Sequence, residues 1–363
     1  MEKIKRISAI VLAMVMLFSL ASCSLVNASQ TDITSDTIKI GVILEGTQDD
    51  LTGNTGICNS SIKELTDLGY GIKIERFKFA ENVDPADADA VAEAYKTLVN
   101  FECNMIIASS PAYMEGTVKV ADETPDVAFF VYGGEGNGKN VFGFKAANAG
   151  SAYLEGIVAG LKAAELKTPK LGYILANAND YSTVNAFAKG AKSVFAEAAI
   201  SAVVAGEDIA ANANALIKDG CKVLASDIQS EEIAKAATEA KVFFCDYGTE
   251  QFNTEDYSSA YLCTPVYNFT QYFIDTIKTI IDFEVPEGTD ASASAVELIT
   301  NQKLISDYNG GYATGAAYLS DISSNAAVGT NAALKAVSET LMNGSLSLDI
   351  HVSELEPNVS LAK

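Results

Sequence analysis

The chain alternates short apolar runs with amphipathic stretches of helical spacing, and it starts this pattern twice. The predicted strands lie at 37–44, 72–77, 105–108 and 127–132, and then at 170–175, 200–205, 222–225 and 241–245. The predicted helices lie between them, at 54–68, 85–100, 183–199, 208–218 and 231–240. Strands that alternate with helices build parallel sheets from βαβ units. The pattern therefore predicts an α/β protein with two doubly wound, Rossmann-like lobes.

Length and charge agree with this prediction and exclude other classes. The 363 residues are enough for two domains of about 150 residues each. With 47 acidic and 25 basic residues the formal net charge is −22, which opposes binding to a phosphate backbone. Because 48% of the residues are hydrophobic, the chain is not a disordered acidic tail either. We expect a globular protein that does not bind nucleic acid.

The N-terminal residues predict export. Basic residues near Met1 precede 14 mostly apolar residues, and Leu20-Ala21-Ser22-Cys23 then resembles the lipobox of bacterial lipoproteins. We expect a lipoprotein signal peptide at 1–22, a lipid on Cys23, and a lipid-anchored tether at 23–36; an ordinary signal peptide is the alternative. No later stretch reaches the roughly 18 apolar residues that span a bilayer. These features predict an extracytoplasmic protein, lipid-anchored on the outer face of the bacterial cytoplasmic membrane.

Residues for catalysis or metal binding are scarce. Apart from Cys23 the chain has five cysteines without CxxC spacing, so neither a disulfide framework nor a zinc site is expected. The only histidine, His351, is far from the loops that follow the predicted strands, which leaves no Ser/His/Asp or Cys/His arrangement there. The adjacent carboxylates of Asp49 and Asp50 leave a hydrolase open as an alternative, but sequence neighbours do not by themselves flank a scissile bond. We expect no enzyme activity, no metal and no cofactor.

A glycine run at 133–138 follows a predicted strand but fits neither GxGxxG nor GxxxxGK[ST], so we interpret it as a turn. In doubly wound sheets, ligands bind at loops after the carboxyl ends of strands, and two hinged lobes can close over a small molecule. The loops that meet this criterion are 45–54, 109–113, 132–138, 176–183, 226–229 and 246–250.

These loops are rich in carboxylate, amide and tyrosine side chains. Carboxylates and amides can bind vicinal hydroxyl groups, and aromatic rings can stack on sugars or heteroaromatic rings. The alternative is that Asp and Asn serve there only as helix caps and turn formers. The loops contain no arginine, which favours a neutral ligand. The candidate ligand-binding residues are Asp49, Asp50, Asn54, Tyr113, Tyr181, Asp246 and Tyr267.

Several segments are similar to the patterns of one protein family. Residues 49–54 (DDLTGN) are similar to its first-loop pattern D-D-x-S-F-N, and 125–129 (PDVAF) to its P-D-V-x-F segment. Residues 140–141 (NV) and 153–156 (YLEG) are similar to its asparagine-valine strand and Y-L-x-G helix. Residues 244–246 (FCD) resemble its G-V-D strand end, and 343–346 (NGSL) its closing segment. The chain thus resembles the BMP (basic membrane protein) substrate-binding lipoproteins of ABC transporters, and the similarity covers nearly all of the chain after residue 22.

The resemblance implies a type I periplasmic-binding fold, two lobes joined by a three-segment hinge. Lobe 1 would comprise 37–144 plus 265–309 and lobe 2 would comprise 145–264 plus 310–363. The chain would cross between the lobes near Phe144, Thr264 and Gly310. The implied function is capture of a small neutral solute for ABC permease subunits, and a purine nucleoside, which several members of the family bind, is the first candidate. A sugar or another small polar ligand, or a surface sensor without transport, are the alternatives.

Within this resemblance, Asp246 is expected to bind ribose-like hydroxyl groups, and Asp49 and Asn54 are expected to form hydrogen bonds with polar edges of the ligand. The chain also departs from the family pattern. Gly53 stands where the family usually has a stacking phenylalanine, Gly150 where it has a glutamate, Gly248 where it has a second acid, and Tyr267 where it has a lysine. We therefore expect Tyr113 and Tyr181 to supply the stacking.

Overall fold

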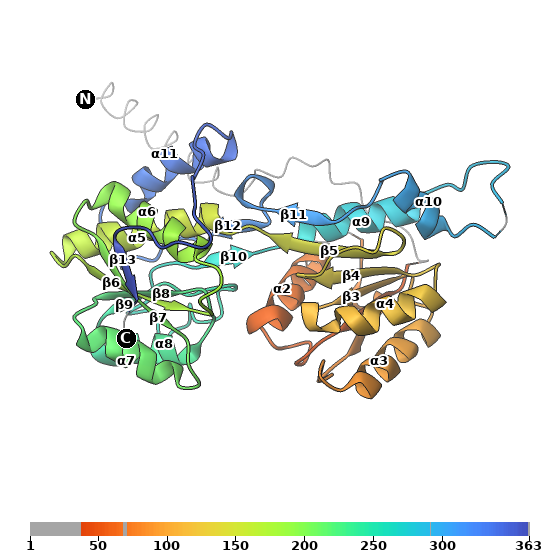
Figure 1. The fold of residues 1–363 in the computed structure, drawn as a ribbon, viewed down its shortest axis with the longest axis horizontal. Coiled ribbons are helices and arrows are strands. Elements are labelled where there is room, and N and C mark those ends of the chain that lie inside the picture. The colour runs from red at the N-terminus through yellow and green to blue at the C-terminus, as the bar shows by residue number, and fades with distance from the viewer. Residues whose placement is uncertain (1–37, 68–70, 291, 362–363) are drawn as a thin grey trace, which may run out of the picture.

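The computed structural model describes residues 38–67, 71–290 and 292–361. Within these residues two sheets lie side by side, with helices packed against them (Figure 1). The strand order is β11-β5-β4-β3-β1-β2 in the six-stranded sheet and β13-β7-β6-β8-β9 in the five-stranded sheet. Neighbouring strands run parallel in both. The predicted α/β class with doubly wound sheets is confirmed.

The six-stranded sheet takes most of its strands from the first part of the chain. They are β1 (Ile40–Ile43), β2 (Phe77–Ala80), β3 (Met105–Ala108), β4 (Ala128–Tyr132), β5 (Val141–Ala146) and the late β11 (Tyr308–Gly310). One face packs against α2 (Gly53–Asp67), α9 (Thr270–Asp282) and α10 (Ala295–Asn301). The other face packs against α3 (Ala88–Asn100) and α4 (Met114–Glu123). The short 3-10 turns η1 (Ile74–Arg76) and η2 (Pro111–Tyr113) complete this half.

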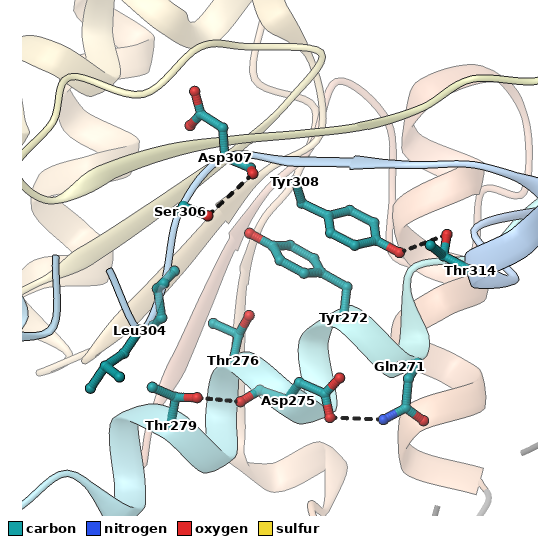
Figure 2. Close-up of a pocket in the computed structure, with 11 residues that line it drawn as sticks. Gln271, Tyr272, Asp275, Thr276, Thr279, Leu304, Ser306, Asp307, Tyr308 and Thr314 are labelled. Carbon is teal, nitrogen blue, oxygen red and sulfur yellow. Dashed lines mark hydrogen bonds between the residues drawn. The ribbon is translucent and has the colours of Figure 1, made fainter. Parts of the chain in front are cut away.

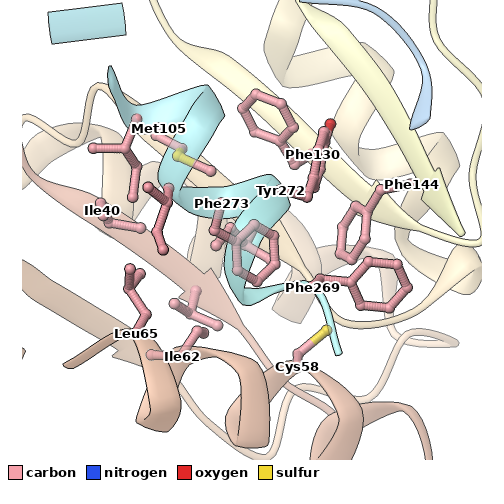
Figure 3. Close-up of a cluster of buried hydrophobic side chains, with 14 of the residues drawn as sticks. Ile40, Cys58, Ile62, Leu65, Met105, Phe130, Phe144, Phe269, Tyr272 and Phe273 are labelled. Carbon is pink, nitrogen blue, oxygen red and sulfur yellow. The ribbon is translucent and has the colours of Figure 1, made fainter. Parts of the chain in front are cut away.

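Aromatic side chains fix α9 onto the six-stranded sheet (Figure 3). The ring of Phe144, on β5, lies edge-on to Phe269 and Phe273, with centroid distances of 5.0 and 5.4 Å. All three rings are fully buried. Because buried aromatic rings contribute large apolar areas, this cluster ties a helix from late in the chain to strands formed early in it.

The five-stranded sheet belongs to the second part of the chain. Its strands are β6 (Lys170–Leu175), β7 (Ala199–Val204), β8 (Val223–Ser226), β9 (Phe243–Phe244) and β13 (Val359–Leu361). One face packs against α5 (Ala149–Glu165), α6 (Ser182–Val194) and α11 (Thr330–Met342), and the other against α7 (Ile209–Lys218) and α8 (Glu231–Ala240).

Glycines let α5 and α6 touch backbone to backbone. A Cβ atom on Gly156 would lie 2.0 Å from the carbonyl oxygen of Phe187, and one on Gly190 would lie 1.9 Å from that of Tyr153. No side chain fits at these positions. The glycine of the segment 153–156 therefore has a packing role in this helix pair.

A two-stranded antiparallel ribbon of β10 (Pro265–Tyr267) and β12 (Ala317–Leu319) lies between the two sheets (Figure 1). The 3-10 turn η3 (Tyr312–Thr314) leads from β11 to this ribbon. The chain leaves the six-stranded sheet after β5 and returns to it for β11. The predicted lobe boundaries and the crossing points near Phe144, Thr264 and Gly310 stay predictions.

Some predicted elements begin or end elsewhere. The strand expected at 72–77 is wrong: residues 74–76 form η1, and β2 begins at Phe77, whose partner in β1 is Ile40. The alternation of apolar residues was misleading, because Ile72 is buried whereas Ile74 is half exposed. The helix expected to reach residue 199 ends at Val194, since Ala199 already begins β7.

The glycine run at 133–138 forms the connection between β4 and β5. Gly133 and Gly138 have φ values of +66° and +73°, which favour glycine. The carboxylate of Asp307 accepts hydrogen bonds from the amides of Gly136 (3.1 Å) and Gly143 (2.8 Å). This run is a turn tied to the strand β11.

The predicted signal peptide, Cys23 and the tether lie outside the described residues. Across residues 38–361, gaps aside, no helix has the length and apolar character that crossing a membrane requires. The other five cysteines are free and buried, and His351 is exposed.

Candidate functional site

A cavity of about 480 Å³ lies where strands from both sheets end. Residues after β5, β6 and β8, together with the ribbon strand β10, form most of its wall. This is where an open α/β sheet presents loops to a ligand. The lining residues are Lys145, Ala146, Ala147, Asn148, Ala149, Ala176, Asn177, Asp180, Ser182, Thr183, Asp227, Tyr247, Tyr267, Asn309, Ile350 and Val352.

Asp227, directly after β8, is the more buried of the two carboxylates in this wall. Its Oδ1 accepts a hydrogen bond from the amide of Ala176, at the end of β6. Burial, with a smaller contribution from the nearby charge of Asp180, raises the pKa of Asp227 to about 6, although hydrogen bonds from backbone amides oppose this shift. Near neutral pH the carboxylate is therefore ionised and can accept hydrogen bonds from ligand hydroxyl groups.

Tyrosine hydroxyls form a second polar feature of the wall. The hydroxyl groups of Tyr247 and Tyr267 are hydrogen-bonded at 2.8 Å, and their rings meet edge to face with centroids 5.7 Å apart. Burial raises the pKa of Tyr267 to about 12, so its hydroxyl group stays protonated. The pair offers neutral hydroxyl groups and aromatic edges.

Amide and hydroxyl groups lie beside the start of two helices. Asn148 precedes α5, and its Oδ1 accepts a hydrogen bond from the hydroxyl of Thr183, in the first turn of α6, at 3.1 Å. Lys145 is the single basic residue among the lining residues, which also include the carboxylates of Asp180 and Asp227. The wall thus combines amides, hydroxyls and few charges, which suits a small polar molecule with several hydroxyl groups.

Of the seven predicted ligand-binding residues, Tyr267 lines this cavity. Tyr181 lies next to it: Asp180 and Ser182 line the wall, while the ring of Tyr181 packs on the core of the five-stranded half. The amide of Tyr181 donates to the carbonyl of Val352, which brings the C-terminal segment into the wall.

Three predicted residues, Asp49, Asp50 and Asn54, lie at the loop after β1 and at the start of α2, outside the cavity wall. The carboxylate of Asp50 accepts hydrogen bonds from the amide and hydroxyl of Thr52, at 2.8 and 2.6 Å. This is the turn-forming role that aspartate side chains often have in loops. Asp49 is exposed and Asn54 is half-buried.

Asp246 is buried and is not one of the residues of the cavity wall. Its Oδ2 accepts a hydrogen bond from the amide of Phe252 at 3.3 Å. Burial raises its pKa to about 7, so the side chain is partly protonated near neutral pH.

The stacking role predicted for Tyr113 needs correction. Its side chain is fully buried in the core between the six-stranded sheet and α3, and its hydroxyl donates to the carbonyl of Val83 at 2.6 Å. A ring enclosed by the core has no face for a ligand. The prediction placed Tyr113 correctly in the segment that follows β3. In the structure this segment forms η2, and the ring of Tyr113 is buried in the core.

The sequence did not single out Lys145, Asn148 or Asn309 as ligand residues. Lys145 lies at the end of β5 and Asn309 in β11, a three-residue strand with no alternating pattern of its own. The signal that could have found Lys145 is its place at a strand end, next to the predicted crossing point at Phe144.

A second cavity, of about 360 Å³, lies between α9 and residues 304–308 (Figure 2). Its most prominent feature is the stacked pair of Tyr272 and Tyr308, with ring centroids 4.4 Å apart. No residue of the five-stranded half lines it, and it does not lie at the strand ends that both sheets share. We therefore take the cavity around Asp227 as the candidate site. In the part of the chain that the structure describes, no group of three or more His, Cys, Asp or Glu side chains could hold a metal ion.

Comparison with known proteins agrees with this architecture. Residues 37–297 match the family model Bmp, described as ABC transporter substrate-binding protein PnrA-like. A relative from Haloferax volcanii, which bears the name ABC transporter glucose-binding protein TsgA13, is 26% identical over 241 residues. The match covers 60% of this chain and spans 59% of the length of that relative.

Two solved structures share the fold. An ABC transporter solute-binding protein from Conexibacter woesei aligns with a TM-score of 0.65 at 16% identity, covering 86% of this chain and 99% of that one. A protein from Bacillus halodurans, titled a transcriptional activator of the comK gene, aligns with a TM-score of 0.64 at 18% identity, covering 85% and 99%. At these identities the likeness shows the fold alone, and it supports the predicted type I periplasmic-binding architecture.

Proposed function

The chain belongs to the Bmp family of PnrA-like ABC transporter substrate-binding proteins, and from this premise we propose that it captures a small, neutral, hydroxyl-bearing solute in the cavity around Asp227. A purine nucleoside is the first candidate. Capture is by closure of the two halves around the solute, without covalent chemistry. The family is one of solute-binding proteins and not of enzymes.

The observation that carries this proposal is the composition of the cavity wall. One ionised carboxylate, several amides and two tyrosine hydroxyl groups converge from both halves of the molecule. Asp227 can bind two vicinal hydroxyl groups of a ribose, and the edges of Tyr247 and Tyr267 can lie against a planar base. With one lysine and two carboxylates, the wall has no excess of positive charge for an anionic solute.

A sugar is the second candidate. The relative from Haloferax volcanii is named as a glucose-binding protein, and a hexose also offers vicinal hydroxyl groups to Asp227 and to the amides. Neither Tyr247 nor Tyr267 needs to stack on a base in that case. The two candidates differ in whether an aromatic base contributes to affinity.

We further propose the setting in which capture occurs. The predicted lipid on Cys23 would hold the protein on the outer face of the bacterial cytoplasmic membrane, and ABC permease subunits would receive the solute. The predicted roles of Asp49, Asn54 and Asp246 in solute binding also belong to this proposal. Metabolic labelling with a fatty acid, compared between the wild type and Cys23→Ser, tests the anchor.

A thermal-shift screen tests the ligand class. Adenosine, guanosine, inosine and glucose are each added to the purified protein, because a ligand at one hundred times its dissociation constant stabilises the folded state by about 2.7 kcal/mol. We expect a shift with at least one nucleoside, and loss of that shift in Asp227→Asn. Asp256→Asn is the matched control, because Asp256 is exposed and outside the cavity wall.

The outcomes separate the candidates. A shift with glucose and none with nucleosides would move the assignment to a sugar. No shift with any of the four compounds, together with no small molecule of these classes in a mass spectrum of the purified protein, would contradict the proposed ligand class.

A further inference from the structure

Two hydrogen bonds join the loop after β1 to the five-stranded half, where the two residues that make them are hydrogen-bonded to each other. The amide of Gly53 donates to Oε1 of Gln229 at 3.1 Å. Nε2 of Gln229 lies within hydrogen-bonding distance of Oγ1 of Thr249, at 2.6 Å, and of its carbonyl oxygen, at 3.3 Å. The hydroxyl of Thr249 in turn donates to the carbonyl of Leu51 at 2.8 Å. We call this set, Leu51, Gly53, Gln229 and Thr249, the latch.

The latch has a single consistent arrangement of donors and acceptors. The hydroxyl of Thr249 has one proton, and because that proton goes to Leu51, the oxygen must accept from the amide of Gln229. This fixes the orientation of the Gln229 side chain, since a flipped amide would set its NH2 group against the amide of Gly53. The side chains of Gln229 and Thr249 therefore act together in one hydrogen-bond circuit.

Glycines with positive φ angles lie in both of the segments that the latch joins. Gly53 has φ +54° and Gly248, which precedes Thr249, has φ +85°, a region that favours glycine. Gly248 donates to the carbonyl of Pro265 at 2.9 Å and accepts from the amide of Tyr267 at 3.1 Å. Thr249 is thus anchored to β10, the strand that places Tyr267 in the cavity wall.

From this geometry we propose that Gln229 and Thr249 are positioning residues for solute capture, which hold the two halves closed by latching the loop 51–53. The proposal rests on the proposed function for its biological meaning. All donors and acceptors of the latch are protein atoms, so its strength does not depend on the chemistry of the solute. The latch sets how long the closed form lasts, and with it the residence time of the captured molecule.

Small-angle X-ray scattering of the purified protein without added solute tests the latch directly. Thr249→Val keeps the shape of the side chain and removes both of its hydrogen bonds, and Gln229→Leu removes the amide. The matched controls are Thr238→Val, whose hydroxyl bonds only within α8, and Gln271→Leu, whose amide bonds Asp275 on α9. We expect a larger radius of gyration in both latch variants and no change in the controls.

Dissociation of adenosine, followed by stopped-flow fluorescence, is the second measurement. We expect dissociation to be about tenfold faster in either latch variant, since each loses hydrogen bonds that stabilise the closed form. The double variant should differ little from the single ones, because the two residues act in one circuit.

The two measurements separate the latch from the ligand assignment. A changed scattering profile in a protein that does not bind adenosine leaves the latch in place and removes the nucleoside. Unchanged scattering in both Thr249→Val and Gln229→Leu overturns the latch, whether or not adenosine binds.

Discussion

The hydroxyl oxygens of Tyr247 and Tyr267 lie 2.8 Å apart in the wall of the cavity that the two halves share. Tyr247 follows β9 of the five-stranded sheet, and Tyr267 ends the ribbon strand β10. One of the two hydroxyl protons forms the hydrogen bond between the oxygens, and the other can be donated to a further acceptor. The position of β10 therefore determines where these two hydroxyl groups lie in the candidate site.

Tyr267→Phe is expected to weaken solute binding by about five- to tenfold, because a hydroxyl group and its link to Tyr247 are lost. Isothermal titration with the solute that the thermal-shift screen identifies measures this change. Tyr173→Phe is the control: its hydroxyl is buried without a hydrogen-bond partner among the described residues, so its removal should leave affinity unchanged. Equal affinities for wild type and Tyr267→Phe would remove Tyr267 from the site.

Solute affinity is expected to fall as the pH drops below about 6, since Asp227, with a pKa raised to about 6, then loses its charge as an acceptor. Asp227→Asn should flatten the profile between pH 5 and 7.5 in titration calorimetry. The effect on folding has the opposite sense. Because the folded pKa lies above the unfolded value of about 3.9, this group's contribution to stability is present below pH 4 and is lost as the pH rises through 6. A pH profile that Asp227→Asn leaves unaltered would assign the titration to another group.

Tyr113→Phe is expected to lower the free energy of unfolding by about 1–3 kcal/mol without changing solute affinity. The hydroxyl is buried and donates to the carbonyl of Val83, which the variant leaves without that donor. Urea denaturation and titration calorimetry on the same preparation give the two quantities. A loss of affinity at unchanged stability would contradict the prediction and give the Tyr113 hydroxyl group a role in solute binding.

Glu155→Met is expected to stabilise the protein. Glu155 is fully buried in α5, and neither carboxylate oxygen has a hydrogen-bond partner among the described residues. Burial raises its pKa well above the usual range, so the folded state holds the carboxyl group in its neutral form. Replacing an unpartnered polar group by an apolar one of similar size should raise the free energy of unfolding by about 1–3 kcal/mol.

The pH dependence provides a check on Glu155. With a raised folded pKa, its contribution to stability is full below the unfolded pKa of about 4.3 and is lost as the pH rises toward the folded value. The stability gain of Glu155→Met, measured in urea, should therefore be larger at pH 8 than at pH 5. Glu155→Gln, which keeps a buried polar group, should gain less. A destabilised Glu155→Met protein would contradict the prediction.

The local pattern of the sequence was sufficient for the class of fold and for many elements. Strands such as β3 and β6 were predicted with the bounds that the structure has, because apolar runs between helical stretches mark buried parallel strands. Membership of the Bmp family was also readable from short segments of the sequence. The three-residue strands β10, β11, β12 and β13 were missed, since so short a strand has no periodicity and depends on pairing with distant residues.

The candidate site was likewise predicted only in part from the sequence. The sequence alone indicated the loops after the strands, because parallel strands place their carboxyl ends at one edge of a sheet. It also named Tyr267, which lies in β10 and in the cavity wall. It did not distinguish Tyr113, whose ring turns into the core, from a tyrosine that faces the cavity. Gly53 and Gln229 are 176 residues apart, and their hydrogen bond depends on how the two sheets pack together. Periodicity fixes which residues belong to a strand or helix, whereas contacts between the halves depend on long-range packing, which only the tertiary structure decides.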